Sequence, residues 1–262
     1  MTTGRYAAMF KRCATVREGA FGAFLMLGDP DLATSAALLD ALVEGGADMV
    51  ELGIPFSDPV ADGPVIQAAA KRALGAGVRT QHCLELVAAF RVRHGDVPIG
   101  ILTYANIVAA RGIARFCGEL ADAGVDSLLV ADVPSVEAAP YAAAAQGAGI
   151  DLVMIAAPNT PKATLAKIAA LSSGYTYCVA RSGVTGADAA LALDHKALFD
   201  GLSAVGAPPP VLGFGISSPE QVREALASGA AGVISGSAIV ARVSDGVDAV
   251  RDFVASMKAA TR

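Results

Sequence analysis

The segment Met49-Val-Glu-Leu-Gly-Ile-Pro-Phe-Ser-Asp-Pro-Val-Ala-Asp-Gly-Pro64 begins as a short apolar run and continues as a loop with three prolines. Such a run, bounded by turn residues, predicts a buried strand. The phrase Glu44-Gly-Gly-Ala-Asp48 comes directly before it. Glycine at the end of a helix, followed by a short connection, is typical of the step from a helix into a strand. The segment therefore predicts one strand and its loop within an alternating α/β chain.

The same pattern recurs along the whole chain. Eight apolar runs alternate with Ala- and Leu-rich helical segments, and they cover Ala20–Leu27, Met49–Ile54, Ile99–Tyr104, Ser127–Ala131, Leu152–Ala157, Tyr175–Ala180, Val211–Ile216 and Gly232–Ser237. Alternating strands and helices favour parallel strands with right-handed crossovers, and eight such units predict a closed (β/α)8 TIM barrel. A doubly wound open sheet is the alternative. It is disfavoured because no Gly-rich dinucleotide fingerprint follows the first run.

Two helices lie outside the eight units. A helix over residues 5–16 precedes the first strand, and we expect it to close the floor of the barrel. An inserted helix, Thr80–Arg93, lies after unit two. We find no linker or low-complexity segment, so we expect residues 1–262 to form a single barrel domain.

The overall composition excludes several functional classes. Hydrophobic residues make up 54% of the chain and charged residues 17%, which is enough apolar material for a sizeable core. The net charge of −5, with no basic run among aromatics, argues against a nucleic-acid surface. No long uninterrupted apolar stretch predicts a membrane span. The four cysteines are widely spaced, so we expect free thiols and a cytoplasmic location.

Glu51 is the most informative single residue, because it lies within a predicted buried strand. Strand side chains alternate between faces. If Val50 and Leu52 face the surrounding helices, Glu51 points into the barrel. Burial raises the pKa of a carboxyl group and suits it to general acid–base catalysis. The alternative is a structural glutamate whose carboxyl group is hydrogen-bonded to backbone or water.

Asp62 is the second candidate carboxylate, on the loop after this strand. The loop is long for a connection between a strand and a helix, which favours an active-site loop. Pro64 suits the first turn of the next helix. Asp62 could therefore simply lie near the N-terminus of that helix, and Asp58 could be a turn residue of Ser57-Asp-Pro59.

Three Gly-rich segments at the ends of the last three strands predict an anion site. They are Ser182-Gly-Val-Thr-Gly186, Gly213-Phe-Gly-Ile-Ser217 and Ser235-Gly-Ser-Ala238. Glycine lets a ligand approach the backbone, and we expect Ser237 to open the last helix, whose free N–H groups attract anions. Phosphate sites recur at this place in barrels. Tight turns between strand and helix are the alternative explanation.

Residue types that are missing from the strand ends narrow the chemistry further. None of the three histidines lies at a strand end, so we expect no metal site. No lysine lies within a predicted strand, which disfavours a Schiff-base aldolase. The chain also lacks a Gly-x-Ser-x-Gly nucleophile elbow. Acid–base catalysis by carboxylates remains.

These motifs together resemble the tryptophan synthase alpha subunit family over nearly the whole chain, from about residue 5 onward. The resemblance rests on the segment from Glu51 to Pro64, and also on Leu27-Gly-Asp-Pro30, Leu128-Leu-Val-Ala-Asp-Val-Pro134, Gly174-Tyr-Thr-Tyr177, Gly183-Val-Thr-Gly186, Gly213-Phe-Gly-Ile-Ser217 and Ile234-Ser-Gly-Ser-Ala-Ile-Val240. It implies a lyase that cleaves indole-3-glycerol phosphate to indole and glyceraldehyde 3-phosphate, a retro-aldol reaction in tryptophan biosynthesis.

The resemblance also implies roles for individual residues. Glu51 is the expected acid–base residue, and Asp62 is its carboxylate partner, which accepts a hydrogen bond from the indole N–H. The implied substrate-binding residues are Phe24, Leu102, Ala131, Ile155, Tyr177, Thr185, Gly186, Phe214, Gly215, Gly236 and Ser237. The phosphate contacts among them are Gly186, Gly215, Gly236 and Ser237. Tyr104 and Tyr175 are expected near the pocket as walls.

The resemblance further implies a partner. The family forms an αββα heterotetramer in which the beta subunit carries pyridoxal phosphate and receives indole, so this chain is expected to hold no cofactor. Candidate interface residues are Pro55, Asp58 and Asn106. Two rival hypotheses stay open at this point: another phosphate-binding barrel enzyme, such as an isomerase or synthase of the same pathway, and a non-catalytic subunit that activates a partner.

Overall fold

The structure is a computed structural model of the chain, and it describes residues 4–179 and 195–262. Within these residues the strands are β1 (Ala20–Met26), β2 (Met49–Gly53), β3 (Ile99–Thr103), β4 (Ser127–Val130), β5 (Asp151–Leu152), β6 (Ile155–Ala156), β7 (Thr176–Val179), β8 (Pro210–Gly213) and β9 (Gly232–Ser235). All pairings between them are parallel.

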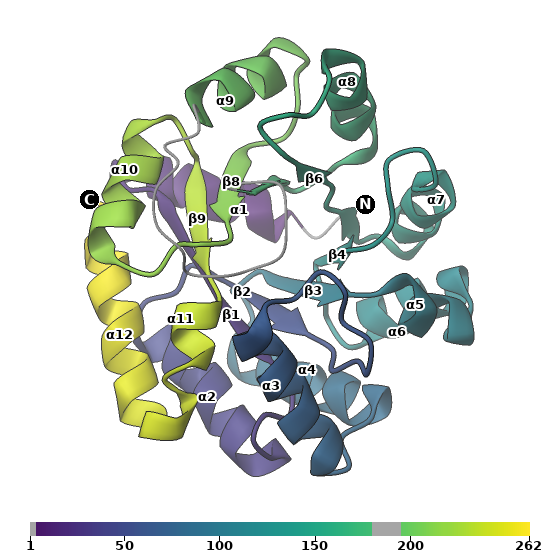
Figure 1. Cartoon of the computed structure of the whole chain (residues 1–262), viewed down its shortest axis with the longest axis vertical. Coiled ribbons are helices and arrows are strands. Elements are labelled where there is room, and N and C mark those ends of the chain that lie inside the picture. The colour runs from purple at the N-terminus through teal and green to yellow at the C-terminus, as the bar shows by residue number, and fades with distance from the viewer. Residues whose placement is uncertain (1–3, 180–194) are drawn as a thin grey trace.

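Helices surround this sheet in Figure 1. They are α1 (Arg5–Thr15), α2 (Leu32–Glu44), α3 (Pro64–Gly75), α4 (Thr80–Arg93), α5 (Ala105–Arg111), α6 (Ile113–Asp122), α7 (Ala139–Ala148), α8 (Lys162–Leu171), α9 (His195–Ala204), α10 (Pro219–Ala227), α11 (Ser237–Val240), the 3-10 helix η1 (Val243–Asp245) and α12 (Val247–Ala259). No helix in the described ranges combines the length and the apolar character that a bilayer crossing requires.

The sheet closes into a barrel through one short segment, residues 151–156. The strand order runs β5-β4-β3-β2-β1-β9-β8-β7-β6, and β5 and β6 are separated by only Val153 and Met154. Val153 N–H donates to Leu128 of β4, and the Met154 carbonyl accepts from Tyr177 of β7. One stretch of chain therefore joins both edges of the sheet. The predicted (β/α)8 barrel is confirmed, and the open sheet is excluded.

The fifth strand is where the structure differs most from the sequence prediction. A single strand over Leu152–Ala157 was expected, but regular strand geometry is limited to two residues on each side of the break. Strands in a barrel are staggered, so a segment that completes the ring pairs with its two neighbours at different heights. The chain pairs first with β4 and then with β7, and the barrel still closes.

Aspartates at the bottom of the barrel fix the starts of neighbouring strands. The Asp126 N–H donates to the Ile99 carbonyl, and the Ile99 N–H donates back to the Asp126 carboxylate at 2.8 Å. Asp48 makes the same exchange with Phe21, where the N–H to carboxylate distance is 2.9 Å. Asp48 ends the helix-to-strand phrase Glu44-Gly-Gly-Ala-Asp48, and Asp126 ends a similar phrase, Asp122-Ala-Gly-Val-Asp126. They serve as strand clamps.

Helix α1 lies behind the strands in the view of Figure 1, at the bottom of the barrel. Arg5 reaches the Asp126 carboxylate at 2.8 Å, and Arg12 reaches Asp48 at 3.1 Å. The Tyr6 hydroxyl hydrogen-bonds the Ser127 hydroxyl at 2.8 Å. Polar contacts along the helix therefore attach it to the strand clamps, in the floor position expected from the sequence.

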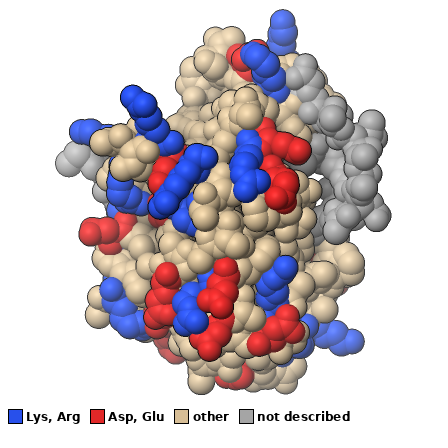
Figure 2. Space-filling view, turned by 90° about the vertical axis from the view of Figure 1, so that its left-hand side faces the viewer, with Lys and Arg blue, Asp and Glu red and all other residues tan. Residues whose placement is uncertain are grey.

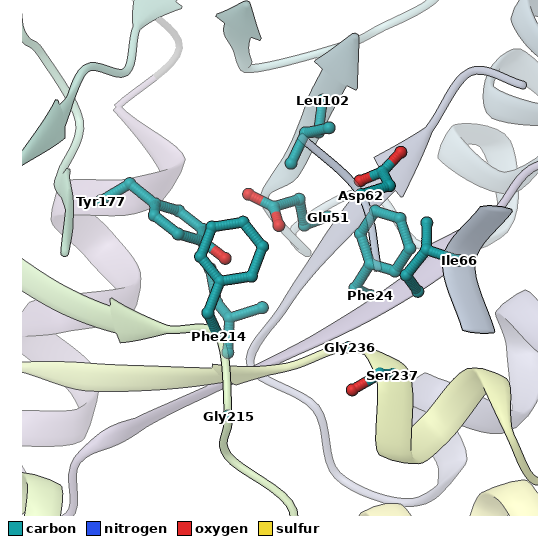
Figure 3. Close-up of a pocket in the computed structure, with 11 residues that line it drawn as sticks. Phe24, Glu51, Asp62, Ile66, Leu102, Tyr177, Phe214, Gly215, Gly236 and Ser237 are labelled. Carbon is teal, nitrogen blue, oxygen red and sulfur yellow. The ribbon is translucent and has the colours of Figure 1, made fainter. Parts of the chain in front are cut away.

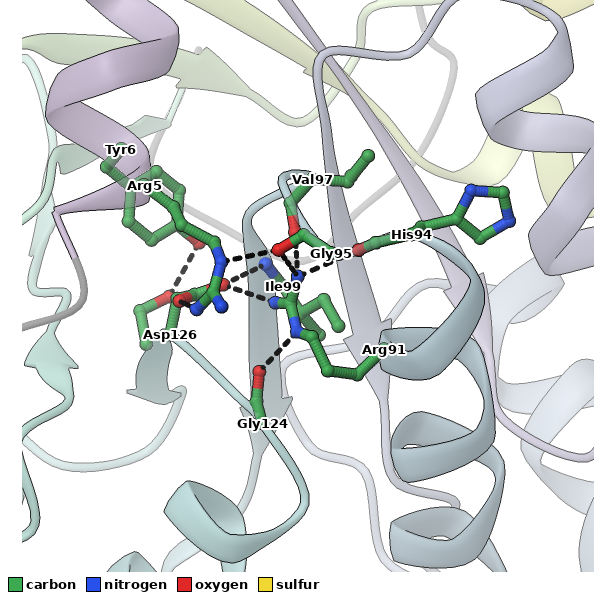
Figure 4. Close-up of polar contacts among 10 residues, drawn as sticks. Arg5, Tyr6, Arg91, His94, Gly95, Val97, Ile99, Gly124 and Asp126 are labelled. Atoms are coloured by element: carbon green, nitrogen blue, oxygen red, sulfur yellow. Dashed lines mark hydrogen bonds and ion pairs between the residues drawn. The ribbon is translucent and has the colours of Figure 1, made fainter.

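The Asp126 clamp is the most elaborate of these contacts (Figure 4). Its carboxylate, fully buried, also accepts from Arg91 at 2.6 Å. The same guanidinium donates to the carbonyl oxygens of Gly124, Gly95 and Val97. A buried ion pair is stable only when its remaining donors and acceptors are satisfied, and here the surrounding carbonyls satisfy them.

The outer surface carries charges of both signs. Figure 2 shows Lys and Arg interspersed with Asp and Glu over the face that contains α10 and α12. On α12, Arg251 pairs with Asp248 at 2.9 Å. This face has no extended patch of one sign.

Replacing Asp126 with alanine should strongly destabilise the fold. The change leaves the Arg91 and Arg5 charges without their carboxylate and the Ile99 N–H without its acceptor. The loss of one partner of a buried ion pair lowers the free energy of unfolding by about 3–5 kcal/mol. The matched control is Asp248→Ala, which breaks an exposed pair and should cost less than about 1 kcal/mol. Urea unfolding measures the free energy of unfolding of both variants. Equal small losses would contradict a stabilising role for the Asp126 contacts.

Candidate active site

A single pocket at the carboxyl ends of the strands contains most of the residues predicted from the sequence. It is lined by Phe24, Glu51, Asp62, Ile66, Leu102, Tyr177, Phe214, Gly215, Ile234, Gly236 and Ser237. Figure 3 shows the Glu51 carboxyl group between Tyr177 and Phe214 on one side and Phe24 and Asp62 on the other. The pocket thus combines two carboxyl groups with an apolar and aromatic wall.

Glu51 lies on β2 and points into the barrel, which confirms the direction expected from strand alternation. It pairs in register with Phe24 of β1 and with Gly100 of β3. Only 3% of the residue is exposed. The Tyr175 hydroxyl donates to Oε1 of Glu51 at 3.1 Å. Gly100 leaves room for the neighbouring hydrogen bond between Tyr6 and Ser127, because a Cβ there would lie 2.9 Å from the Ser127 hydroxyl and 3.1 Å from that of Tyr6.

Burial dominates the electrostatics of Glu51. Desolvation raises the pKa of Glu51 to about 8, with a smaller upward contribution from the nearby Asp62 charge. The hydrogen bond from Tyr175 opposes this rise. At neutral pH the folded protein therefore holds Glu51 mainly in its protonated form, able to donate a proton.

Asp62 lies on the loop between β2 and α3, and 6% of the residue is exposed. Desolvation raises the pKa of Asp62 to about 6, while a hydrogen bond from Tyr104 lowers it. Asp62 is therefore mainly ionised at neutral pH, beside a protonated Glu51. Asp62 also directly precedes Gly63, the N-cap of α3, so it lies near the N-terminus of that helix, as the alternative expected, and it lines the pocket as well.

The aromatic wall depends on a glycine. Tyr177 on β7 meets Phe214 edge-on, with ring centroids 5.5 Å apart. A Cβ on Gly213 would lie 2.0 Å from the Tyr177 hydroxyl oxygen and 2.1 Å from its ring. Only glycine at this position leaves room for the Tyr177 ring. The next residue, Phe214, has a positive φ of 59°, which turns the chain into the pocket rim.

The expected anion site is present in part. Gly215 has a φ of +84°, and a Cβ there would meet nothing within 4 Å, so the backbone borders open space. Gly236 and Ser237 begin α11. The expectation that Ser237 opens the last helix is wrong: α11 is a single turn, and α12 follows it. The turn forms because the N–H groups of Ile239 and Val240 both donate to the Gly236 carbonyl.

Some predicted residues lie elsewhere. Ala131 and Ile155 are half-buried and pack against the core rather than lining the pocket. Thr185 and Gly186 lie outside the described residues. Of the three interface candidates, Asp58 and Asn106 are exposed, whereas Pro55 is buried and offers a partner almost no surface.

Two residues that line the pocket, Ile234 and Ile66, were not predicted from the sequence. Ile234 alternates with outward-facing Val233 and Ser235 along β9, so the same alternation that identified Glu51 could have found it. Ile66 lies in the first turn of α3. No sequence pattern distinguishes it from an ordinary core residue of that helix.

Replacing Gly213 with alanine should impair the pocket without unfolding the barrel. The new methyl group would displace the Tyr177 ring, so ligand affinity and turnover should both fall. Gly118→Ala on α6 is the matched control, because a Cβ there meets nothing and alanine favours a helix. Kinetics and circular dichroism of both variants test this. Unchanged kinetics in Gly213→Ala would show that the ring position is unimportant.

Comparison with known proteins agrees with this geometry. The sequence profile of the family described as tryptophan synthase alpha chain matches residues 10–262. The tryptophan synthase alpha chain of Aeromonas salmonicida is 51% identical, and the alignment covers 98% of both chains. That of Shewanella amazonensis is 49% identical, over 98% of this chain and 99% of the relative.

Solved structures lead to the same family. The structure of Mycobacterium tuberculosis tryptophan synthase superposes with a TM-score of 0.90 at 33% identity, covering 98% of each chain. The tryptophan synthase alpha chain of Legionella pneumophila gives a TM-score of 0.87 at 29% identity, covering 100% of this chain and 97% of the other. The chain belongs to the tryptophan synthase alpha chain family.

Proposed function

We propose that this chain is a carbon–carbon lyase that cleaves indole-3-glycerol phosphate to indole and glyceraldehyde 3-phosphate in tryptophan biosynthesis, with Glu51 and Asp62 as its catalytic residues. The observation that carries the residue assignment is the pair of buried carboxyl groups whose pKa values differ: about 8 for Glu51 and about 6 for Asp62. A neutral acid beside an ionised carboxylate is the arrangement that this reaction needs.

The reaction begins with a proton transfer to the indole ring. Glu51, protonated in the resting pocket, donates its proton to the ring carbon that carries the glycerol chain. The ring becomes an iminium cation with its positive charge at the N–H. Asp62 accepts a hydrogen bond from that N–H and stabilises the developing charge.

The second step breaks the carbon–carbon bond. Glu51, now a carboxylate, takes the proton from the hydroxyl on the adjacent glycerol carbon. That carbon becomes the aldehyde as the bond electrons return to the ring and restore neutral indole. Glu51 ends protonated, so one residue carries the proton in both steps and the cycle needs no cofactor.

The rest of the pocket fits this substrate. Phe24, Leu102, Tyr177 and Phe214 supply an apolar wall for the indole ring. Gly215, Gly236 and Ser237 also line the pocket, and we propose that their backbone N–H groups bind the phosphate, since N–H groups at a helix start lack intrahelical partners. Thr185 and Gly186 would complete the site. Ala131 and Ile155 would act only as support behind the wall.

We further propose that the chain works with the beta subunit of tryptophan synthase in an αββα complex, with pyridoxal phosphate confined to that partner. Asp58 on the β2–α3 loop and Asn106 on α5 are exposed and are the surface candidates, whereas Pro55 is buried at the start of that loop. We also propose that residues 1–262 form one barrel domain, which the single sheet supports. A cytoplasmic location is the last part of the proposal, and the four buried free cysteines support it.

Glu51→Gln should reduce indole formation by about 10²–10⁴-fold, the range typical of a lost general acid–base group, while substrate binding is retained. Glu119→Gln on α6 is the matched control; that side chain pairs with Arg111 and Arg115 at the surface. A colorimetric indole assay, with and without beta subunit, measures both. Unchanged turnover in Glu51→Gln would eliminate its role. No indole from the wild type, even with beta subunit, would favour a non-catalytic activating subunit or another phosphate-binding enzyme.

The pH dependence of kcat/KM should be bell-shaped. Asp62 must be ionised, so activity should rise as pH increases through about 6. Glu51 must be protonated, so activity should fall as pH increases through about 8. The two groups interact, so the pKa values measured from the two limbs of the profile are properties of the pair and not of either residue alone. In Asp62→Asn the acid limb should disappear; an acid limb that persists there would assign it to another group.

A further inference from the structure

Tyr104 occupies a position that the proposed chemistry has not yet used. It follows β3 directly, serves as the N-cap residue of α5, and is only 2% exposed. Its ring stacks on Phe56 of the β2–α3 loop, with centroids 5.3 Å apart and planes inclined by 30°. The ring thus joins the end of β3 to the loop that carries Asp62.

The Tyr104 hydroxyl makes two contacts with that same loop. It accepts a hydrogen bond from the Ala61 N–H at 3.2 Å. Its own proton is then free to be donated, and the side chain that it hydrogen-bonds is the Asp62 carboxylate. A tyrosine hydroxyl can accept and donate at once. One oxygen therefore fixes both the backbone before Asp62 and the carboxylate itself.

A purely apolar wall would not need this hydroxyl. A buried hydroxyl requires partners, yet Tyr104 could have been phenylalanine if it only stacked on Phe56. The start of α5 is also fixed independently, because the Ala105 N–H donates to the Asp132 carboxylate at 2.8 Å. The hydroxyl is therefore not required to begin that helix. The contacts of the hydroxyl are instead made with the β2–α3 loop.

We propose that Tyr104 is a positioning residue for the reaction: its hydroxyl holds the Asp62 carboxylate in place and in its ionised form. This inference rests on the proposed function of Asp62. Donation of a hydrogen bond to a carboxylate favours the charged form. Loss of the donor should therefore weaken charge stabilisation in the transition state more than it weakens substrate binding.

Other ionisable groups lie around Asp62 and also contribute to the pH dependence of activity. Among the described residues they are Glu51 on β2, Tyr104 itself and Tyr177 on β7, with the Asp132 charge acting on Tyr104 from beyond the β4 end. Tyr104 is the side chain that acts on Asp62 through a hydrogen bond, whereas Glu51 and Tyr177 interact with Asp62 through charge. The acid limb of the pH profile is therefore the direct measure of the Asp62 environment.

Tyr104→Phe keeps the stacked ring and removes only the hydroxyl. We expect kcat for indole formation to fall about tenfold or more, as for the loss of a hydrogen bond to a charged group, with a smaller change in KM. The acid limb should move to higher pH, because Asp62 loses a donor that lowers its pKa. In an Asp62→Asn background the same substitution should change kcat little, because Tyr104 acts through Asp62.

Tyr141→Phe on α7 is the matched control. Tyr141 is also buried, at 9% exposure, but it lies outside the pocket, so its loss should leave kcat and the acid limb unchanged. If Tyr104→Phe does not fold, fluorotyrosine at position 104 tests the same point, since its more acidic hydroxyl should move the acid limb to lower pH.

The outcomes separate the two hypotheses. An active wild-type enzyme whose acid limb does not move in either Tyr104 variant overturns the positioning role and leaves the proposed function intact. Equal loss of kcat from Tyr104→Phe with and without Asp62 also overturns it. A wild-type chain that forms no indole with the beta subunit overturns the proposed function instead.

Discussion

Closure of the parallel sheet by residues 151–156 is the constraint on which the rest of the molecule depends. This segment pairs with β4 on one side and with β7 on the other. An open sheet would leave two unpaired edges and would place its first and last strands far apart. In the closed ring, Phe24 of β1, Leu102 of β3 and Tyr177 of β7 face one another across a single pocket.

Closure also determines the chemistry of the pocket, because it removes Glu51 from water. An isolated carboxylate would be unstable in that interior, so the side chain holds its proton near neutral pH. Tyr175 provides its one direct hydrogen bond among the described side chains, and the Tyr175 ring in turn packs at a tilt of 53° against Tyr6 of α1, with centroids 5.2 Å apart. The helix that seals the floor thus supports the proton donor at the centre, and the Asp126 and Asp48 clamps hold that helix.

Much of this arrangement could be predicted from the sequence, and the exceptions have physical causes. Alternation along β2 placed Glu51 inside, and helix α4 begins and ends at the predicted residues. Periodicity did not reveal the break in the fifth strand, since stagger is a property of the closed ring rather than of local sequence. Whether Ala131 and Ile155, which lie at strand ends, contact the substrate stays a prediction, since neither lines the pocket directly. The hydrogen bonds of Tyr104 and Tyr175 join residues far apart in the chain, so the sequence indicated only walls.

The two carboxyl groups explain why the Tyr104 hydroxyl matters. Burial pushes the pKa of each carboxyl group upward, and a hydrogen bond from a tyrosine opposes that rise at each one. A pocket with both carboxyl groups protonated could donate a proton but could not stabilise the cation that results. Glu51 is the more completely buried and also feels the charge of Asp62, so it takes the proton. Asp62, nearer the rim and bonded by Tyr104, keeps its charge. A difference in burial, adjusted by one hydroxyl group, thus divides two similar side chains into an acid and a counter-ion.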